Sequence, residues 1–375
     1  MKIAVNTRLL IKDKFEGIGW FVLENLKRIT RKHKEHQFIF LFDRPFSEEF
    51  IFSDNIIPVI IPPAARHPFL WYLWFEYSVA YALKKYKADF FLSPDGWLSL
   101  KTPIKSLPVI HDLNFEHYPE FIPFIARKYY HHFFPLFAAK AHRIATVSEF
   151  TKNDIVQKYN IDPEKIDVVY NGANEIYTPL TEEEKEKTKI EFSHDCPYFL
   201  FIGLIHPRKN LSNLFAAFDK FKHAVGGNIK LIVVGDKKWW TEDIDTAFNK
   251  MDYKHDVIFL GRIPSENLKR IIGAALAMTY VSFFEGFGIP ILEAMYCDVP
   301  VITSNCSSMP EIAGNAGILV DPFSSDAIKD AMCQIASDAV LRNQMIEKGR
   351  IQRSNFSWDK TSERLWNSIQ KSLDT

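Results

Sequence analysis

The chain has 375 residues, of which 47% are apolar and 25% are charged, a composition typical of a soluble globular protein long enough for two domains. Lys and Arg together number 46, as do Asp and Glu, which gives no electrostatic case for a nucleic acid partner. No apolar run reaches the length that spans a bilayer, and the four cysteines lack metal-type spacing. We therefore expect a cytoplasmic protein with reduced thiols.

The first half begins with the pattern of an α/β domain. Residues 2–7 are predicted to form a buried strand, and Gly17 and Gly19 open a helix that runs to about residue 32. Strand, glycine turn and helix are the beginning of a doubly wound fold. Val22 stands where a dinucleotide-binding fingerprint has its third glycine, which counts against a nicotinamide enzyme. Further strands are predicted at residues 38–42, 59–61, 90–92, 108–110, 144–148 and 168–174.

Two segments of this half are unusually aromatic. Residues 64–86 have helical spacing, and residues 125–143 are a second predicted helix that mixes aromatic side chains with Arg127 and Lys128. This spacing favours burial in the core. A surface that contacts lipid is the alternative.

His111 follows directly after the predicted strand 108–110. The carboxyl end of a strand is where open α/β sheets bind ligands. Asp112 would either orient His111 or cap the turn that follows. A histidine with a purely structural role is the alternative.

The second half begins after a change in composition. Residues 181–189 are almost entirely charged or polar and indicate a solvated helix, so we place the domain boundary between residues 177 and 178. The strand predicted at 198–202 leads to Arg208 and Lys209, whose planar fork and compact charge both suit phosphate oxygens. Further strands are predicted at 230–235 and 257–262, and Asp243 and Asp245 are expected on the surface.

Residues 280–295 carry the most informative pattern in the sequence. A strand at 276–281 is followed by a glycine-rich turn, and Pro290 suits the first position of a helix. The turn lets backbone N–H groups of residues 287–289 approach an anion at the helix N-terminus. Glu285 lies in the turn and Glu293 in the predicted first turn of the helix, so the two carboxylates would hold different parts of one ligand.

This stretch resembles the signature of retaining nucleotide-sugar glycosyltransferases with the GT-B fold, in which a Glu, seven residues and a second Glu follow in order. The resemblance continues through residues 300–304, 309–311 and 317–322. It implies an α/β protein with two doubly wound Rossmann-like domains facing a cleft. Residues 1–177 would be the acceptor-side domain and residues 178–355 the donor-binding domain, with a last helix at 356–375 that crosses back to the first domain.

The same resemblance implies roles for particular residues. Glu293 would accept hydrogen bonds from the ribose hydroxyls, and Glu285 would face the transferred sugar. No metal ion or other cofactor is expected, because Arg208 and Lys209 would balance the diphosphate. The implied catalytic residues are His111, Arg208, Lys209 and Glu285. The implied donor-binding residues are Gly17, Gly19, Arg262, Phe287, Gly288, Ile289 and Glu293.

The predicted reaction is transfer of a hexose from a nucleotide sugar to a hydroxyl of a glycan or lipid-linked glycan. The resemblance is strongest to mannosyltransferases, which indicates GDP-mannose as the donor. A UDP-sugar donor, an epimerase or phosphorylase of the same fold, and a catalytically silent scaffold are the alternatives. Peripheral contact with the inner face of a membrane is a further expectation, based on the aromatic and basic helices.

Overall fold

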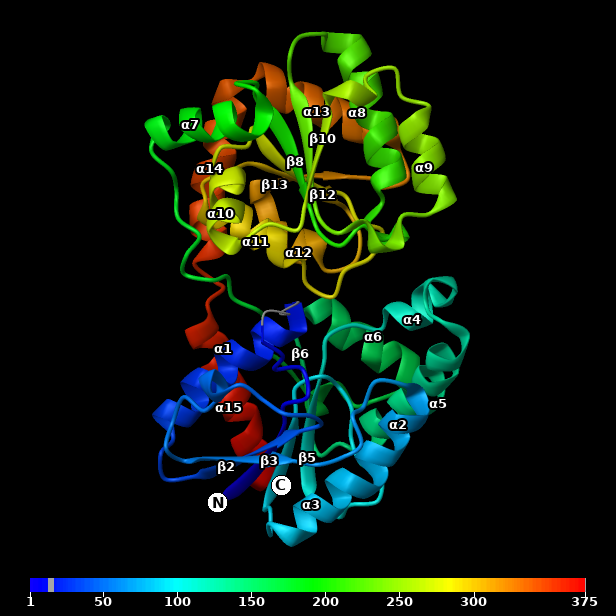
Figure 1. Cartoon of the computed structure of the whole chain (residues 1–375), viewed down its shortest axis with the longest axis vertical. Coiled ribbons are helices and arrows are strands. Elements are labelled where there is room, and N and C mark those ends of the chain that lie inside the picture. The colour runs from blue at the N-terminus through cyan, green and yellow to red at the C-terminus, as the bar shows by residue number, and fades with distance from the viewer. Residues whose placement is uncertain (13–16, 375) are drawn as a thin grey trace. The chain divides into compact units, whose positions relative to one another are not determined.

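The computed structural model describes residues 1–12 and 17–374. The chain divides into two compact units, the first made of residues 1–172 and 358–375 and the second of residues 173–357. The predicted boundaries at 177/178 and 355/356 lie a few residues from these. In each unit a parallel sheet has helices on both sides (Figure 1).

The sheet of the first unit has seven strands in the order β3-β2-β1-β4-β5-β6-β7, and every pair is parallel. Its strands are almost completely apolar because helices cover both faces. They are β1 (Lys2–Asn6), β2 (Gln37–Phe42), β3 (Ile56–Ile60), β4 (Phe90–Ser93), β5 (Lys105–Ile110), β6 (Ile144–Thr146) and β7 (Ile166–Val168).

The helices of this unit include the last helix of the chain. Trp358 and Trp366 of that helix pack on Phe21 of the first helix and on His33 just after it, with ring centroids 6.3 and 3.7 Å apart. The helices are α1 (Gly17–Lys32), α2 (Pro68–Leu73), α3 (Ala80–Lys85), α4 (Asn114–His117), α5 (Phe124–Lys140), α6 (Glu149–Tyr159) and α15 (Trp358–Asp374), and a π-helical segment (Trp74–Val79) joins α2 to α3.

The second unit repeats the architecture with a six-stranded parallel sheet in the order β10-β9-β8-β11-β12-β13. Its strands are β8 (Tyr198–Ile202), β9 (Lys230–Val234), β10 (Val257–Gly261), β11 (Ala277–Tyr280), β12 (Val301–Ser304) and β13 (Gly317–Val320). Its helices are α7 (Glu182–Ser193), α8 (Leu211–Val225), α9 (Glu242–Asn249), α10 (Ser265–Gly273), α11 (Ile289–Tyr296), α12 (Met309–Ala313), α13 (Ser325–Ser337) and α14 (Ala339–Arg353).

Several strand predictions were wrong at their boundaries. The strands expected at 108–110 and 144–148, for example, are β5 (Lys105–Ile110) and β6 (Ile144–Thr146). The strand expected at 59–61 is β3, which begins at Ile56 because its backbone pairs with Phe38 of β2. The strand expected at 168–174 is β7, which ends at Val168. Its neighbour β6 ends at Thr146, the partner of Val168, so the ladder stops there.

In each sheet the strand order reverses at one point, where the chain returns to the free side of the first strand of that sheet. In the first unit the strands run outward from β1 to β3, and β4 then pairs with the other side of β1. In the second unit β11 likewise returns to the free side of β8. Ligands of doubly wound folds bind beyond the carboxyl ends of the strands at such a point.

Candidate functional site

The loops after β8 and β11 form the candidate site of the second unit. After β8 a short 3-10 turn, Pro207–Lys209, is capped by His206, whose Nδ1 accepts the Arg208 N–H at 3.2 Å. The backbone carbonyl of Arg208 accepts the Phe283 N–H at 2.9 Å. Two segments far apart in the sequence are thereby joined at the switch point of the sheet.

Arg208, Lys209 and Glu285 meet in one ion-pair cluster. Lys209 Nζ lies 2.7 Å from Glu285 Oε1, and a terminal nitrogen of Arg208 lies 2.9 Å from Oε2. Arg208 also donates to the Phe284 carbonyl. All three side chains are at least four-fifths buried, so solvent screens these interactions only weakly.

The charges of the cluster set the protonation states of its members. Burial acts to raise the pKa of Glu285, but the charges of Arg208 and Lys209 outweigh it and lower the pKa to about 2. Burial, together with the same two cations, lowers the pKa of His206 to about 4. At neutral pH the cluster therefore contains two cations, one carboxylate and a neutral imidazole.

Sequence reasoning missed Tyr280, the last residue of β11. Lys209 Nζ donates to its hydroxyl at 2.6 Å, and the side chain is 1% exposed. Its only signal in the sequence is its place immediately before the glycine-rich turn. The Lys209 ammonium is therefore held by the Tyr280 hydroxyl as well as by the Glu285 carboxylate.

Small polar side chains hold the turn in place. Ser307 Oγ accepts the Glu285 N–H at 3.1 Å. Ser308 Oγ donates to the carbonyls of Glu285 and Phe287 at 2.9 and 3.0 Å. Asn210 Nδ2 donates to the Val281 carbonyl at 2.9 Å. The backbone around Glu285 is thus positioned from three directions before any ligand binds.

The prediction that Glu293 lies in the first turn of its helix was wrong. Helix α11 begins at Ile289, which places Glu293 at the start of the second turn. Its carboxyl group accepts a hydrogen bond from Tyr177, and burial raises its pKa to about 7. Nothing in the sequence indicated the contact with Tyr177, which is 116 positions away in the chain.

The other predicted donor-binding residues divide into two groups. Phe287, Gly288 and Ile289 form the N-terminus of α11, and Gly288 has φ +97°, a backbone conformation that favours glycine. Arg262 follows β10 and is exposed, and β9 separates β10 from β8.

In the first unit His111 lies at the carboxyl end of β5. Its Nε2 hydrogen-bonds the Pro94 carbonyl at 2.8 Å, and burial lowers its pKa. The Asp112 carboxylate accepts the Asn114 N–H at 3.0 Å, so it caps the turn, one of the two roles expected for it. Gly17 and Gly19 lie inside the first turn of α1.

A buried polar cluster of the first unit was also missed. Asp95, after β4, accepts hydrogen bonds from Asn6 Nδ2 at 2.7 Å and from Arg8 Nε at 2.6 Å. Asn6 ends β1 and Arg8 follows it, so the cluster lies at the switch point of this sheet. Asn6 and Asp95 are 89 positions apart, and no local pattern in the sequence links them.

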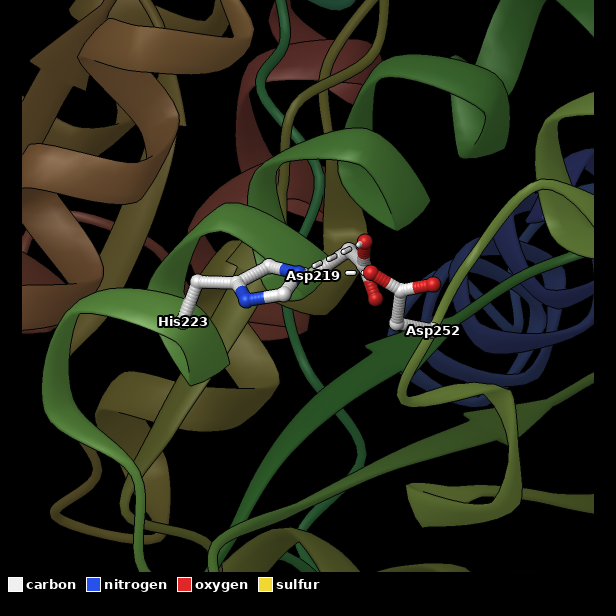
Figure 2. A group of neighbouring side chains, drawn as sticks. All are labelled: Asp219, His223 and Asp252. Atoms are coloured by element: carbon white, nitrogen blue, oxygen red, sulfur yellow. Dashed lines mark hydrogen bonds and ion pairs between the residues drawn. The ribbon is translucent and has the colours of Figure 1, made fainter.

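Over the residues that the structure describes, one group of three could hold a metal ion. Asp219 and His223 of α8 and Asp252 are shown in Figure 2. His223 Nε2 lies 2.9 Å from Asp252 and 3.8 Å from Asp219, and Asp219 accepts the Tyr253 N–H at 2.8 Å. These contacts by themselves account for the arrangement.

Two general expectations concern cysteines and membrane spans. All four cysteines are free. In the described part of the chain, no helix combines the length and the apolarity that crossing a membrane requires. Asp243 and Asp245 are exposed on α9, as expected.

Comparisons with known proteins agree with this architecture. The family profile "Glycosyltransferase Family 4" matches residues 15–175, and "Glycosyl transferases group 1" matches residues 182–352. O-antigen chain mannosyltransferase B of Escherichia coli is 27% identical, with 99% of this chain and 100% of that protein covered. O-antigen chain mannosyltransferase RfbU of Salmonella typhimurium is 30% identical over 62% of each chain.

Solved structures extend the likeness to the fold. A glycosyltransferase from Rickettsia africae superimposes with a TM-score of 0.74 at 20% identity, covering 99% of this chain and 98% of that one. The two profiles match consecutive parts that together make up most of the chain. The chain therefore belongs to the group 1 glycosyltransferases, enzymes with the GT-B fold of two Rossmann-like domains.

Proposed function

We propose that this glycosyltransferase moves mannose from GDP-mannose to a hydroxyl of a glycan or lipid-linked glycan, with retention of configuration and without a metal ion. The observation that supports it best is the cluster of Arg208, Lys209 and Glu285 at the switch point of the second sheet. The two relatives named as O-antigen mannosyltransferases support the choice of sugar. Retention rests on the resemblance of residues 280–295 to retaining enzymes.

The charges of the cluster suit the chemistry of donor cleavage. When the bond between the anomeric carbon and the diphosphate breaks, negative charge grows on the leaving group and positive charge on the sugar. Arg208 and Lys209 would stabilise the first, together with the N-terminus of α11. Glu285 is ionised at neutral pH and would stabilise the second. His111 would hydrogen-bond a hydroxyl of the transferred sugar.

A donor screen tests this function. Transfer and slow donor hydrolysis should be measured with GDP-mannose, UDP-glucose and an ADP-sugar, each in excess EDTA, and the anomeric configuration of the product read by NMR. We expect GDP-mannose to be used and the α-configuration of the donor to be kept. Preference for a UDP-sugar would change the donor assignment. Binding of no nucleotide would favour a silent scaffold.

Contact with a membrane surface is part of the same proposal. Helix α2 packs against α5 and continues through the π-helical segment into α3. Exposed aromatic side chains project from these elements: Phe69, Tyr77, Tyr81 and Phe124 are all more than half exposed. Residues 66–87 and 123–143 contain one acidic residue, Glu76, which is buried and accepts the Leu100 N–H. We call these two segments the basic aromatic face.

The basic aromatic face suits an anionic bilayer because aromatic rings partition to the interface and lysines are attracted to acidic lipids. Binding to anionic and neutral liposomes should be compared by co-sedimentation. At about 1 kcal/mol per basic residue, replacing Lys84, Lys85 and Lys128 with Glu should weaken binding at least about 100-fold. The same replacement of Lys185, Lys187 and Lys189 on α7 is the control. An equal loss of liposome binding in both variants, or no binding of the wild type to anionic liposomes, would favour a soluble acceptor.

A further inference from the structure

Arg8 carries a buried cation that is only partly satisfied. Its side chain is 9% exposed, its Nε donates to Asp95 at 2.6 Å, and its Cζ lies 4.5 Å from the centre of the Trp97 ring. Among the described residues, its two terminal nitrogens have no hydrogen-bond partner. Neither nitrogen is among the unpartnered polar atoms that are fully shut off from solvent, so both keep some contact with solvent. Four N–H groups of the guanidinium fork are therefore available.

Asp95 holds this fork in position and is itself engaged by other donors. Its carboxylate also accepts hydrogen bonds from Asn6 Nδ2 at 2.7 Å and Ser93 Oγ at 3.2 Å. In a planar guanidinium the edge formed by the two terminal nitrogens faces a different direction from Nε. This edge reaches solvent, so an anion that replaces water there gains charge-assisted hydrogen bonds from a fork that is already held in place.

Two tyrosines pack on the ring over which the Arg8 guanidinium lies. Tyr129 and Tyr130 of α5 pack on the same Trp97 ring, with centroids 5.0 and 5.6 Å away. Neither hydroxyl has a hydrogen-bond partner in the described residues. Burial raises the pKa of both groups, so they stay neutral and can donate hydrogen bonds at physiological pH. The negative charges of Asp112 and Glu76 also raise the pKa of these tyrosines. A bound anion is therefore repelled to some extent by the same two carboxylates.

The position of the cluster indicates a substrate rather than a structural ion. Arg8 follows β1 and Asp95 follows β4, the pair of strands at the switch point of the first sheet. We propose that Arg8, with Tyr129 and Tyr130, binds a phosphate group of the acceptor, so that the enzyme glycosylates a phosphate-bearing glycan. This inference rests on the proposed transferase function, because only a transferase has an acceptor. Phosphate binding itself can be measured without turnover.

Calorimetry with inorganic pyrophosphate isolates the site. The Arg208→Ala/Lys209→Ala protein serves as background, because it lacks the two cations of the second unit that would bind the donor diphosphate. We expect this protein to bind pyrophosphate, and adding Arg8→Gln to weaken binding about 10- to 100-fold, the loss of charged hydrogen bonds. Arg143→Gln is the matched control, since it breaks another Arg–Asp pair of this unit, whose side chains are 15% and 16% exposed. If Arg8→Gln does not fold, Arg8→Lys, which keeps the charge but loses the fork, replaces it.

Steady-state transfer identifies the source of the phosphate. One glycan should be offered as a prenyl diphosphate, as a free glycan phosphate and as a neutral glycoside, with saturating donor. We expect Arg8→Gln to raise KM for the phosphorylated acceptors about 10- to 100-fold and to leave the neutral one unchanged. Use of the free glycan phosphate assigns the group to the sugar, and use of the prenyl form alone assigns it to the lipid.

Several results would overturn the inference. They are absence of pyrophosphate binding in the background protein, equal loss of that binding in the Arg8→Gln and Arg143→Gln proteins, and an equal rise in KM for the phosphorylated and the neutral acceptors in the Arg8→Gln protein. Absence of transfer with every acceptor, while pyrophosphate binding still depends on Arg8, would instead refute the proposed transferase function.

Discussion

Replacing Glu285 with Gln removes the one carboxylate that compensates Arg208 and Lys209. The pKa of Glu285 falls from an ordinary value of 4.5 to about 2 in the folded protein. A depressed carboxyl pKa stabilises the fold above the unfolded value, and this stabilisation is lost as the pH falls from 4.5 through 2. At 1.36 kcal/mol per pKa unit, the difference corresponds to about 3 kcal/mol at neutral pH.

We therefore expect the Glu285→Gln protein to be about 3 kcal/mol less stable than the wild type at pH 7, because two buried cations lose their counter-charge. The gap should narrow steadily as the pH is lowered from 5 to 2. Urea unfolding at pH 7, 5 and 3 measures it. A gap of the same size at pH 7 and pH 3 would refute the assignment of the lowered pKa to this ion-pair cluster.

The same variant separates stability from catalysis. GDP brings negative charge to Arg208 and Lys209, so it should still stabilise the variant, by about as much as it stabilises the wild type. The kcat should fall about 100- to 1,000-fold, as when one preorganised electrostatic group is removed, while nucleotide affinity is kept. Loss of GDP binding in this variant would mean that Glu285 acts on the nucleotide instead of the sugar.

The remaining predictions concern the phosphate grip, the metal and the second glutamate. Arg208→Ala and Lys209→Ala should each lower kcat/KM for the donor about 100- to 1,000-fold; unchanged values in steady-state assays would remove these residues from the mechanism. Transfer should proceed fully in excess EDTA, and a strict need for Mg²⁺ or Mn²⁺ would contradict charge balance by the cationic pair. Glu293→Gln should mainly raise the donor KM. Because the pKa of Glu293 is raised to about 7, its contribution to stability is full below 4.5 and is lost as the pH rises through 7. Wild-type donor KM should change between pH 6 and 8, and the change should be absent in the Gln variant.

Local patterns predicted most of the fold. Apolar runs of four to six residues bounded by glycine, proline or polar residues located the parallel strands, because strands buried on both faces need no alternation. Tyr198–Ile202 is a strand with the predicted bounds. The bounds of β3 and β7 differed because pairing with a neighbour, and not the strand's own sequence, decides where a ladder begins and ends.

The sequence by itself determined that the turn at residues 285–288 precedes a helix N-terminus, since glycine and proline impose this backbone locally. The resemblance then pointed to Arg208, Lys209 and Glu285 as one site. Only the tertiary structure decided that a single carboxylate bridges the two cations across 76 positions of sequence, and that Tyr177 hydrogen-bonds Glu293. The same holds for Arg8 and Asp95, which meet because β4 pairs with β1 and not with β3. Strand order is a property of the whole sheet, so contacts between its strand ends leave no periodic signal in either segment.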